Sequence, residues 1–123
     1  MKRSRPDRVA DYLQHMLDAI DRAALHMQGL QSRAEFEQHA MASDAVVRCI
    51  EIIGEAATKI TKSNTAFASA HPRLPWEAMS TMRNKLIHEY FEVDHEVVWQ
   101  TVKNDLPELR AQIVELLRGL RAS

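Results

Sequence analysis

The sequence predicts an all-α protein, folded as an antiparallel bundle of four or five helices. Apolar residues recur at alternating steps of three and four along several long segments, which is the spacing of one helical face. Glycine and proline together occupy only seven of the 123 positions, so turns are few and helices can be long. No segment alternates apolar and polar residues as a strand would. We therefore expect one helical domain covering residues 1–123.

The first helix is expected at residues 7–28. Its inward-facing positions are Val9, Leu13, Met16, Ile20, Ala23, Met27 and Leu30. Gly29 should end or loosen this helix. Ser32 and Glu35 then have the spacing of a capping box, in which both side chains satisfy free backbone N–H groups, so a short helix should begin there.

A second long helix is expected at residues 44–61. Its apolar face comprises Val46, Ile50, Ile53, Ala57 and Ile60. Gly54 lies in the middle of this helix, where glycine lowers helix stability by roughly 1 kcal/mol relative to alanine. This unfavourable choice indicates that another helix approaches closely at this point. The seam of a dimer could lie there. Residues 62–75 are polar, small and proline-bearing, and we expect a loop or a lid.

Two further helices are expected after this loop. Pro75 suits the first position of a helix that runs from Trp76 to about Tyr90, with Met79, Met82 and Leu86 as core candidates. The last helix should begin near residue 94 and continue to residue 119, with Pro107 kinking it because proline removes one intrahelical bond. Its inner face comprises Val98, Val102, Leu106, Leu109, Ile113, Leu116 and Leu120. Trp76 and Trp99 are expected to anchor the bundle.

Composition excludes several classes of protein. No apolar run approaches the roughly 18 residues of a membrane span, and the basic start of the chain has no apolar region of a secretion signal behind it. The single Cys49 excludes an internal disulfide and a cysteine-built zinc site, and suits a reducing cytoplasm. The formal net charge of −1 gives no general attraction for nucleic acid, so any such partner must be bound locally.

Residues 83–90, with the sequence R-N-K-L-I-H-E-Y, concentrate reactive groups within two helical turns. Arg83 offers a planar cation that suits a phosphodiester oxygen. His88 carries an imidazole that exchanges protons near neutral pH, and Asn84 could hold that imidazole in one tautomer. Tyr90 can donate a hydrogen bond to a phosphate or accept a modifying group. Together these residues suit RNA cleavage without a metal, in which a base deprotonates the ribose 2′-OH and an arginine steadies the phosphorus.

Helical geometry limits how these groups can meet. At roughly 100° per residue, Arg83 and Tyr90 lie within about 20° of one another on the helix surface. His88 lies about 140° from Arg83 and about 40° from Asn84. One straight helix cannot point all four groups at one atom. Another element, another subunit or a bend after His88 must complete the site.

Simpler interpretations of the same residues remain open. His88 could be a surface residue near a helix end, Arg83 could pair with Glu51 or Glu77, and Tyr90 could be a half-buried core phenol.

Glu51 and Glu55 lie one turn apart on the second long helix. They could position Arg83 or His88, or they could be surface charges paired with Arg48 or Lys59.

A metal-binding bundle is a further alternative. Glu92 and His95 form one E-x-x-H pattern, to which Glu51, Glu55 and His88 could add ligands. A di-iron bundle needs that pattern on two helices, and only one copy exists here, so we expect no metal site.

The motif and its surroundings resemble the HepT-like toxins of the HEPN ribonuclease superfamily. The R-x(4)-H-x-Y spacing of residues 83–90 is their signature, and residues 48–56 (R-C-I-E-I-I-G-E-A) are similar to their preceding helix. The resemblance continues in the same order through three further segments. These are Pro75-Trp76 at the start of the motif helix, the Y-F-E-V-D run at residues 90–94, and residues 98–107. The first 43 residues match only as a generic helix.

The resemblance implies a homodimeric, metal-independent endoribonuclease toxin without a cofactor. In that family two motif helices meet at a cleft, so Arg83, Asn84, His88 and Tyr90 of both chains would form each site, with Arg48, Glu51 and Glu55 as supporting residues. The partner would be an MNT-type nucleotidyltransferase antitoxin that transfers AMP to Tyr90. The alternative within the same resemblance is a non-catalytic HEPN-type module that holds the transferase and binds RNA or nucleotide without cutting it.

Overall fold

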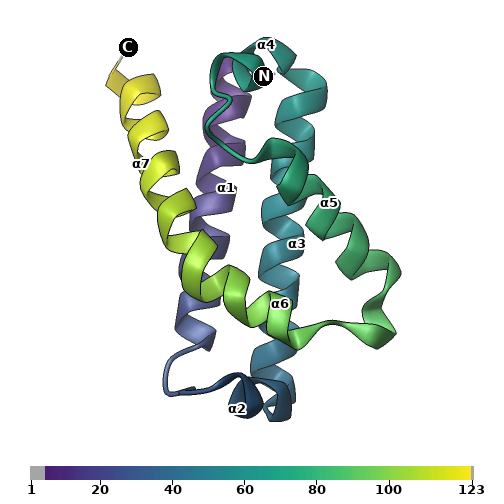
Figure 1. Ribbon diagram of the computed structural model, residues 1–123. Coiled ribbons are helices and arrows are strands. Elements are labelled where there is room, and N and C mark those ends of the chain that lie inside the picture. Colours follow the sequence, from purple (N-terminus) through teal and green to yellow (C-terminus); the bar gives the residue numbers. More distant parts are fainter. Residues whose placement is uncertain (1–4, 123) are drawn as a thin grey trace.

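A computed structural model of the chain describes residues 5–122, so the first four residues of the basic N-terminal start lie outside it. The described residues are almost entirely helical (Figure 1). The helices are α1 (Arg5–His26), α2 (Arg33–Gln38), α3 (Ala40–Ser63), α4 (Thr65–Ala70), α5 (Trp76–His88), α6 (His95–Gln100) and α7 (Leu106–Ala122), with a 3₁₀ turn at Tyr90–Glu92 and a π-helical turn at Thr101–Asp105.

The four long segments run alternately up and down the bundle (Figure 1). α1 packs on α3, α3 on α5, and α7 on α1. The short helix α2 lies at the end where α1 passes into α3, and α4 lies at the opposite end, where α3 passes into α5. This arrangement confirms the predicted all-α antiparallel bundle.

The connection between α1 and α3 follows the predicted signals. Gly29 adopts a φ of +85°, a conformation that side chains disfavour, and it lies in the turn that follows α1. The Ser32 hydroxyl accepts a hydrogen bond from the Glu35 N–H (3.2 Å), and the Glu35 carboxylate accepts one from the Gln31 N–H (2.9 Å). These bonds begin α2 where the capping-box spacing predicted it.

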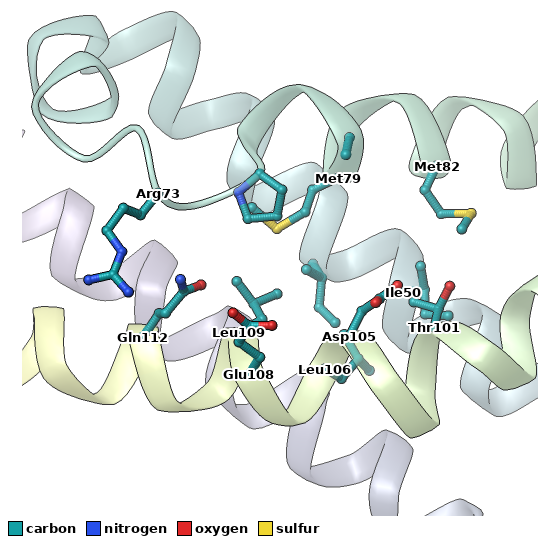
Figure 2. Close-up of a pocket in the computed structure, with 13 residues that line it drawn as sticks. Ile50, Arg73, Met79, Met82, Thr101, Asp105, Leu106, Glu108, Leu109 and Gln112 are labelled. Atoms are coloured by element: carbon teal, nitrogen blue, oxygen red, sulfur yellow. The ribbon is translucent and has the colours of Figure 1, made fainter.

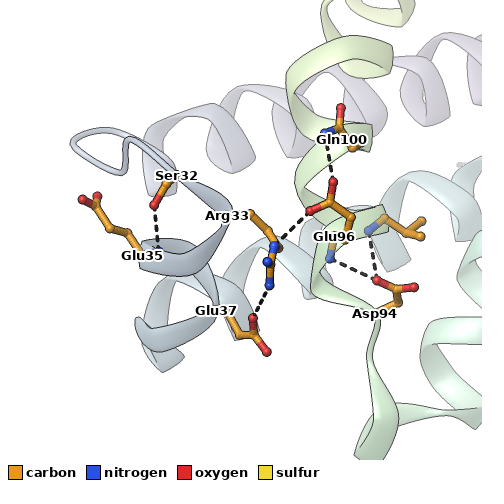
Figure 3. Close-up of polar contacts among 8 residues, drawn as sticks. Ser32, Arg33, Glu35, Glu37, Asp94, Glu96 and Gln100 are labelled. Atoms are coloured by element: carbon orange, nitrogen blue, oxygen red, sulfur yellow. Dashed lines mark hydrogen bonds and ion pairs between the residues drawn. The ribbon is translucent and has the colours of Figure 1, made fainter.

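Polar contacts hold α2 against the segment that follows the motif (Figure 3). The Arg33 guanidinium pairs with Glu37 of its own helix (2.7 Å) and with Glu96 of α6 (3.0 Å). Asp94 caps α6, because its carboxylate accepts hydrogen bonds from the N–H groups of Glu96 and Val97. The segment that follows the motif is therefore fixed to α2 where it ends, at Asp94 and α6.

Several boundaries differ from those predicted. α3 begins at Ala40, because the His39 side chain caps it by accepting a hydrogen bond from the Ala42 N–H (3.1 Å). Residues 62–75 are not a plain loop, since α3 continues to Ser63 and α4 follows at once. Pro75 occupies the position before the first helical residue of α5. α5 ends at His88, two residues before the predicted end.

The irregularity expected from Pro107 takes the form of a π-helical turn. The Leu106 N–H donates to the Thr101 carbonyl, five residues earlier. Proline cannot donate to the carbonyl four residues before it and its ring crowds that turn, so a wider turn immediately before Pro107 relieves both problems.

The core confirms the predicted apolar faces. The inward positions of α1 and α3 are buried, and Trp76 and Trp99 are both buried as bundle anchors. In α7 the face drifts to Leu117, leaving Leu116 and Leu120 only partly buried, because an α-helix turns every 3.6 residues and not every 3.5. Burial raises the pKa of the Cys49 thiol, opposed by the charges of Arg22 and Arg48, so this cysteine is an inert core residue. None of the helices within residues 5–122 has the length and apolar composition needed to cross a bilayer.

Candidate active site

The motif helix α5 crosses α3 at Gly54, and this crossing fixes the position of Arg83. A Cβ atom added to Gly54 would collide with the Arg83 Cβ and would lie 2.6 Å from the Met79 carbonyl oxygen. Only glycine allows the two helices to approach so closely. The close helix–helix approach inferred from the sequence is therefore confirmed, and it joins α3 and α5 of one chain.

Replacing Gly54 with alanine is expected to destabilise the protein by about 1–3 kcal/mol, because the new methyl group must push α5 away from α3. The matched control is Gly119→Ala in α7, where an added Cβ meets no atom within 4 Å. The Gly119→Ala variant should be more stable than the wild type by up to about 1 kcal/mol, because alanine favours the helix. Chemical denaturation of the two variants measures both effects. Equal stabilities for both variants would show that the crossing is not tight.

The Arg83 guanidinium is held by two neighbours. Its Nη2 donates to the Glu55 carboxylate of α3 (2.7 Å), and its Nη1 donates to the Asn84 side-chain oxygen (2.9 Å). The Arg83 Nε is shielded from solvent and has no hydrogen-bond partner within the described residues. An unpaired buried donor lowers the stability of the fold.

These contacts leave part of the guanidinium available. Each terminal nitrogen carries two N–H groups, and each uses one of them on Glu55 or Asn84. The Arg83 side chain is 31 % exposed, so the two remaining N–H groups can reach solvent. Guanidinium N–H donors suit the oxygens of a phosphate. Arg83 is therefore the candidate anion-binding group of the motif.

His88 and Tyr90 lie at the end of the same helix but away from this cluster. His88 is the last residue of α5, is exposed and contacts no hydrogen-bond, ion-pair or aromatic partner in the part of the chain that the structure describes. Tyr90 opens the 3₁₀ turn and is 77 % exposed, with its ring edge-on to Phe91 at 5.6 Å. Neither contacts Arg83, and no hydrogen bond joins Asn84 to His88 among the described residues.

The remaining candidates divide into two groups. Glu55 contacts Arg83, whereas Glu51 pairs with Arg48 of its own helix at 3.3 Å. Glu92 and His95 lie on either side of the Asp94 cap and join no metal-binding cluster, since no group of three or more His, Cys, Asp or Glu side chains within residues 5–122 could hold a metal ion. The di-iron alternative therefore lacks a ligand set in that part of the chain.

Two grooves flank the contact between α3 and α5. The first lies between α5 and α7 and has an apolar floor that includes Ile50, Met79 and Leu109, with Arg73 and Glu108 among its polar rim (Figure 2). It contains none of the four motif residues. The second lies between α1, α3 and α5 and contains Arg83, Glu55 and Ile87. The second groove is therefore the one of these two that includes a motif residue, Arg83, although the first is the more apolar.

Two residues that line the second groove were not predicted from the sequence. Tyr12 and His15 of α1 line it together with Arg83, and their rings lie edge-on at 6.3 Å. Neither residue was among the candidate site residues predicted from the sequence. The available signal was the spacing of His15 from Tyr12, which places both side chains on neighbouring positions of one helical face.

Comparison with known proteins agrees with the resemblance seen in the motif. A family model described as "Ribonuclease HepT-like" matches residues 16–116. A protein named "Putative RNase" from Caldanaerobacter subterraneus subsp. tengcongensis is 36 % identical over 118 residues, which cover 96 % of this chain and 97 % of the relative. A "Putative RNase" from Methanocaldococcus jannaschii is 38 % identical over 86 residues, covering 70 % and 72 %.

A shorter match is more similar still. The "Probable ribonuclease HepT" of Thermococcus cleftensis is 49 % identical over 72 residues, which cover 58 % of this chain and 63 % of that protein. No solved structure matches the chain. The family match runs from the middle of α1 into α7 and so includes the α3–α5 crossing and the whole motif, and the chain belongs to the HepT-like ribonuclease family.

Proposed function

We propose that this protein is an RNA endonuclease that acts in the cytoplasm as the toxin of a toxin–antitoxin pair. The observation that carries the proposal is the state of Arg83: Glu55 and Asn84 fix its guanidinium, and two N–H groups remain free for a phosphate. Five residues later, the exposed His88 supplies a proton-transfer group on the same helix. Membership of a ribonuclease family supports RNA as the phosphodiester.

The proposed chemistry needs only groups of this chain. His88 accepts the proton of a ribose 2′-OH, and the resulting oxygen attacks the adjacent phosphorus. The bond from phosphorus to the 5′-oxygen breaks, which leaves a 2′,3′-cyclic phosphate. The 5′-oxygen takes a proton from water, and the His88 imidazolium returns its proton to solvent. Arg83 stabilises the negative charge that grows on the phosphoryl oxygens. Asn84, which we expected to orient His88, orients the guanidinium in this mechanism because its oxygen accepts from Arg83.

A single chain does not bring these groups together, which supports a site shared between two copies. Three large apolar side chains at the end of the motif helix are exposed: Ile87 is 39 % exposed, Tyr90 77 % and Phe91 71 %. Clusters of exposed apolar residues commonly mark protein interfaces. In a homodimer that covers this end of α5, His88 of one copy would face Arg83 of the other.

Tyr90 is the proposed acceptor of AMP from an MNT-type nucleotidyltransferase antitoxin. Its exposure leaves the phenol oxygen accessible to the active site of another protein. The phenol oxygen would attack the α-phosphorus of ATP, and pyrophosphate would leave. The attached AMP adds negative charge and bulk close to the site where the RNA phosphate must bind, so it would block cleavage.

Co-expression with a partner nucleotidyltransferase is expected to add one or more AMP units to each chain, and Tyr90→Phe should abolish the addition. Intact-mass spectrometry measures the modification. Tyr12→Phe is the matched control, because it removes the other phenol of the chain and should leave the addition unchanged. AMP addition that persists in Tyr90→Phe would assign the modification to another residue.

RNA cleavage by the unmodified chain tests the proposed activity itself. Under single turnover, the unmodified protein should cut RNA and the AMP-bearing protein should not. A chain that binds RNA at the same site without cutting it would instead be the non-catalytic, nucleotide-binding module.

A further inference from the structure

The groove that contains Arg83 continues between α1 and α3. It has a volume of about 470 Å³, and Tyr12 and His15 form one wall while Arg48, Ile52 and Lys59 lie along α3. Tyr12 is half-buried and His15 and Lys59 are exposed, so the ring and the charges all reach the open side.

The lining of this groove carries three fixed cations and two carboxylates, an excess of one positive charge. Besides Arg83, it is lined by Arg48 and Lys59, with the titratable His15 opposite. Its two carboxylates are each already paired with an arginine, Glu51 with Arg48 at 3.3 Å and Glu55 with Arg83 at 2.7 Å.

Charges of both signs continue along α1 beyond the groove. Arg8, His15 and Arg22 are spaced seven residues apart and lie along one face of α1, with Asp11 and Asp18 between them on the same side. Arg22 and Arg48 are both close enough to Cys49 to act on its thiol electrostatically, which places them at the same end of the antiparallel α1–α3 pair. Arg8, near the start of α1, lies toward the opposite end.

We propose that this groove holds the single-stranded RNA that flanks the cleaved bond, with Tyr12 as the platform for one base and Lys59 and Arg48 as contacts to its phosphates. The proposal rests on the proposed ribonuclease function and extends the site beyond the motif. A cationic groove with an aromatic ring is the common means of binding a single strand, because every base has a face that can stack and every nucleotide has a phosphate.

The dimensions suit a short stretch of RNA. Lys59 and Arg48 are eleven residues apart on α3, which corresponds to about 16 Å at 1.5 Å per residue. At roughly 3.4 Å per stacked nucleotide, this length accommodates about four or five nucleotides. Arg83 contacts α3 at Gly54 and Glu55, between these two cations, so the strand would be contacted on both sides of the phosphate that Arg83 binds.

Binding is tested with chains that carry His88→Ala, so that RNA is not consumed. A fluorescein-labelled single-stranded RNA of mixed sequence is titrated over a range of salt concentrations, and fluorescence anisotropy reports Kd. Tyr12→Leu keeps an apolar side chain in the wall and removes the ring. It should weaken binding about five- to 100-fold, whereas Tyr12→Phe, which keeps the ring, should bind as the parent does.

The phosphate contacts are tested by the salt dependence. Lys59→Ala should lower the slope of log Kd against log salt by about 0.7, the amount expected for one lost contact to a single strand. The matched control is Arg118→Ala on α7, whose guanidinium is exposed and pairs with Glu115, and it should leave the slope unchanged. Sedimentation of each variant shows whether the oligomeric state is preserved.

The outcomes separate this inference from the ribonuclease function. If the wild-type chain cleaves RNA but Tyr12→Leu and Lys59→Ala bind it like the parent, the groove is not the RNA site. If Tyr12→Leu changes the oligomeric state, the groove contacts a second copy and the proposal is overturned. If the variants weaken binding as expected while the wild-type chain cuts no RNA, the groove is supported and the ribonuclease function fails.

Discussion

Replacing His88 with alanine is expected to lower the rate of RNA cleavage by about 10²–10⁴-fold, the usual contribution of a positioned proton-transfer group. The reason is that the His88 imidazole is the group that takes up the 2′-OH proton in the proposed mechanism. The measurement is single-turnover cleavage, in which the loss should appear in the rate of the chemical step and not in RNA affinity.

The control is His26→Ala at the end of α1. His26 is also exposed and also occupies the last turn of a helix, but it lies in α1, outside the motif and both grooves. Both variants should keep the wild-type free energy of unfolding within a few tenths of a kcal/mol. The reason is that neither imidazole has a hydrogen-bond, ion-pair or aromatic partner within the described residues. Cleavage by the His88 variant at the rate of the His26 variant would remove His88 from the mechanism.

Much of the fold was predictable because each long helix carries its own local signal. The apolar spacing of α1 and α3 requires only that one face be buried, and the structure buries those residues. The caps at Ser32 and Asp94 are equally local, since each side chain bonds to N–H groups two or three residues ahead. The helices and the core could therefore be predicted without knowing how the helices pack.

Other features had weak local signals. His39 caps α3 although histidine is not among the usual capping residues. α4 is a single short helix of small residues, and it is stabilised partly by a hydrogen bond from the Thr65 hydroxyl to the Thr61 carbonyl. The π-helical turn depends on the fit of α6 and α7 around Pro107, of which the sequence indicates only the proline.

The partners of Arg83 could not be predicted, because they depend on contacts between distant segments. The sequence offered Glu51, Glu55 and Glu77 as acceptors. Gly54 sets the point at which α5 crosses α3, and the crossing places Arg83 beside Glu55 and away from Glu51. Asn84 and His88 are one turn apart, yet Asn84 bonds to Arg83, whose charge attracts the amide oxygen more strongly than a neutral imidazole would.

Mixing two inactive variants is expected to restore cleavage if the site is shared between copies. Arg83→Ala and His88→Ala homodimers should each be inactive, because every site lacks one of the two groups. In a mixed dimer with shared sites, one site combines both substitutions, and the other combines the intact Arg83 of one chain with the intact His88 of its partner. Random exchange at equal amounts should give about half mixed dimers, and hence about a quarter of the wild-type rate.

A site contained within one chain gives the opposite result, since each chain of a mixed dimer still lacks one group. The experiment therefore decides between the two geometries, provided that exchange is shown independently, for example by native mass spectrometry of chains with different tags. Mixed dimers that form but remain inactive would place Arg83 and His88 of the same chain in one site. The segment between His88 and the anchored Asp94 would then have to bend so that the imidazole returns toward the groove beside Arg83. Restored activity would instead explain why the single chain leaves His88 exposed and without a partner among residues 5–122: the group it serves lies on the other copy.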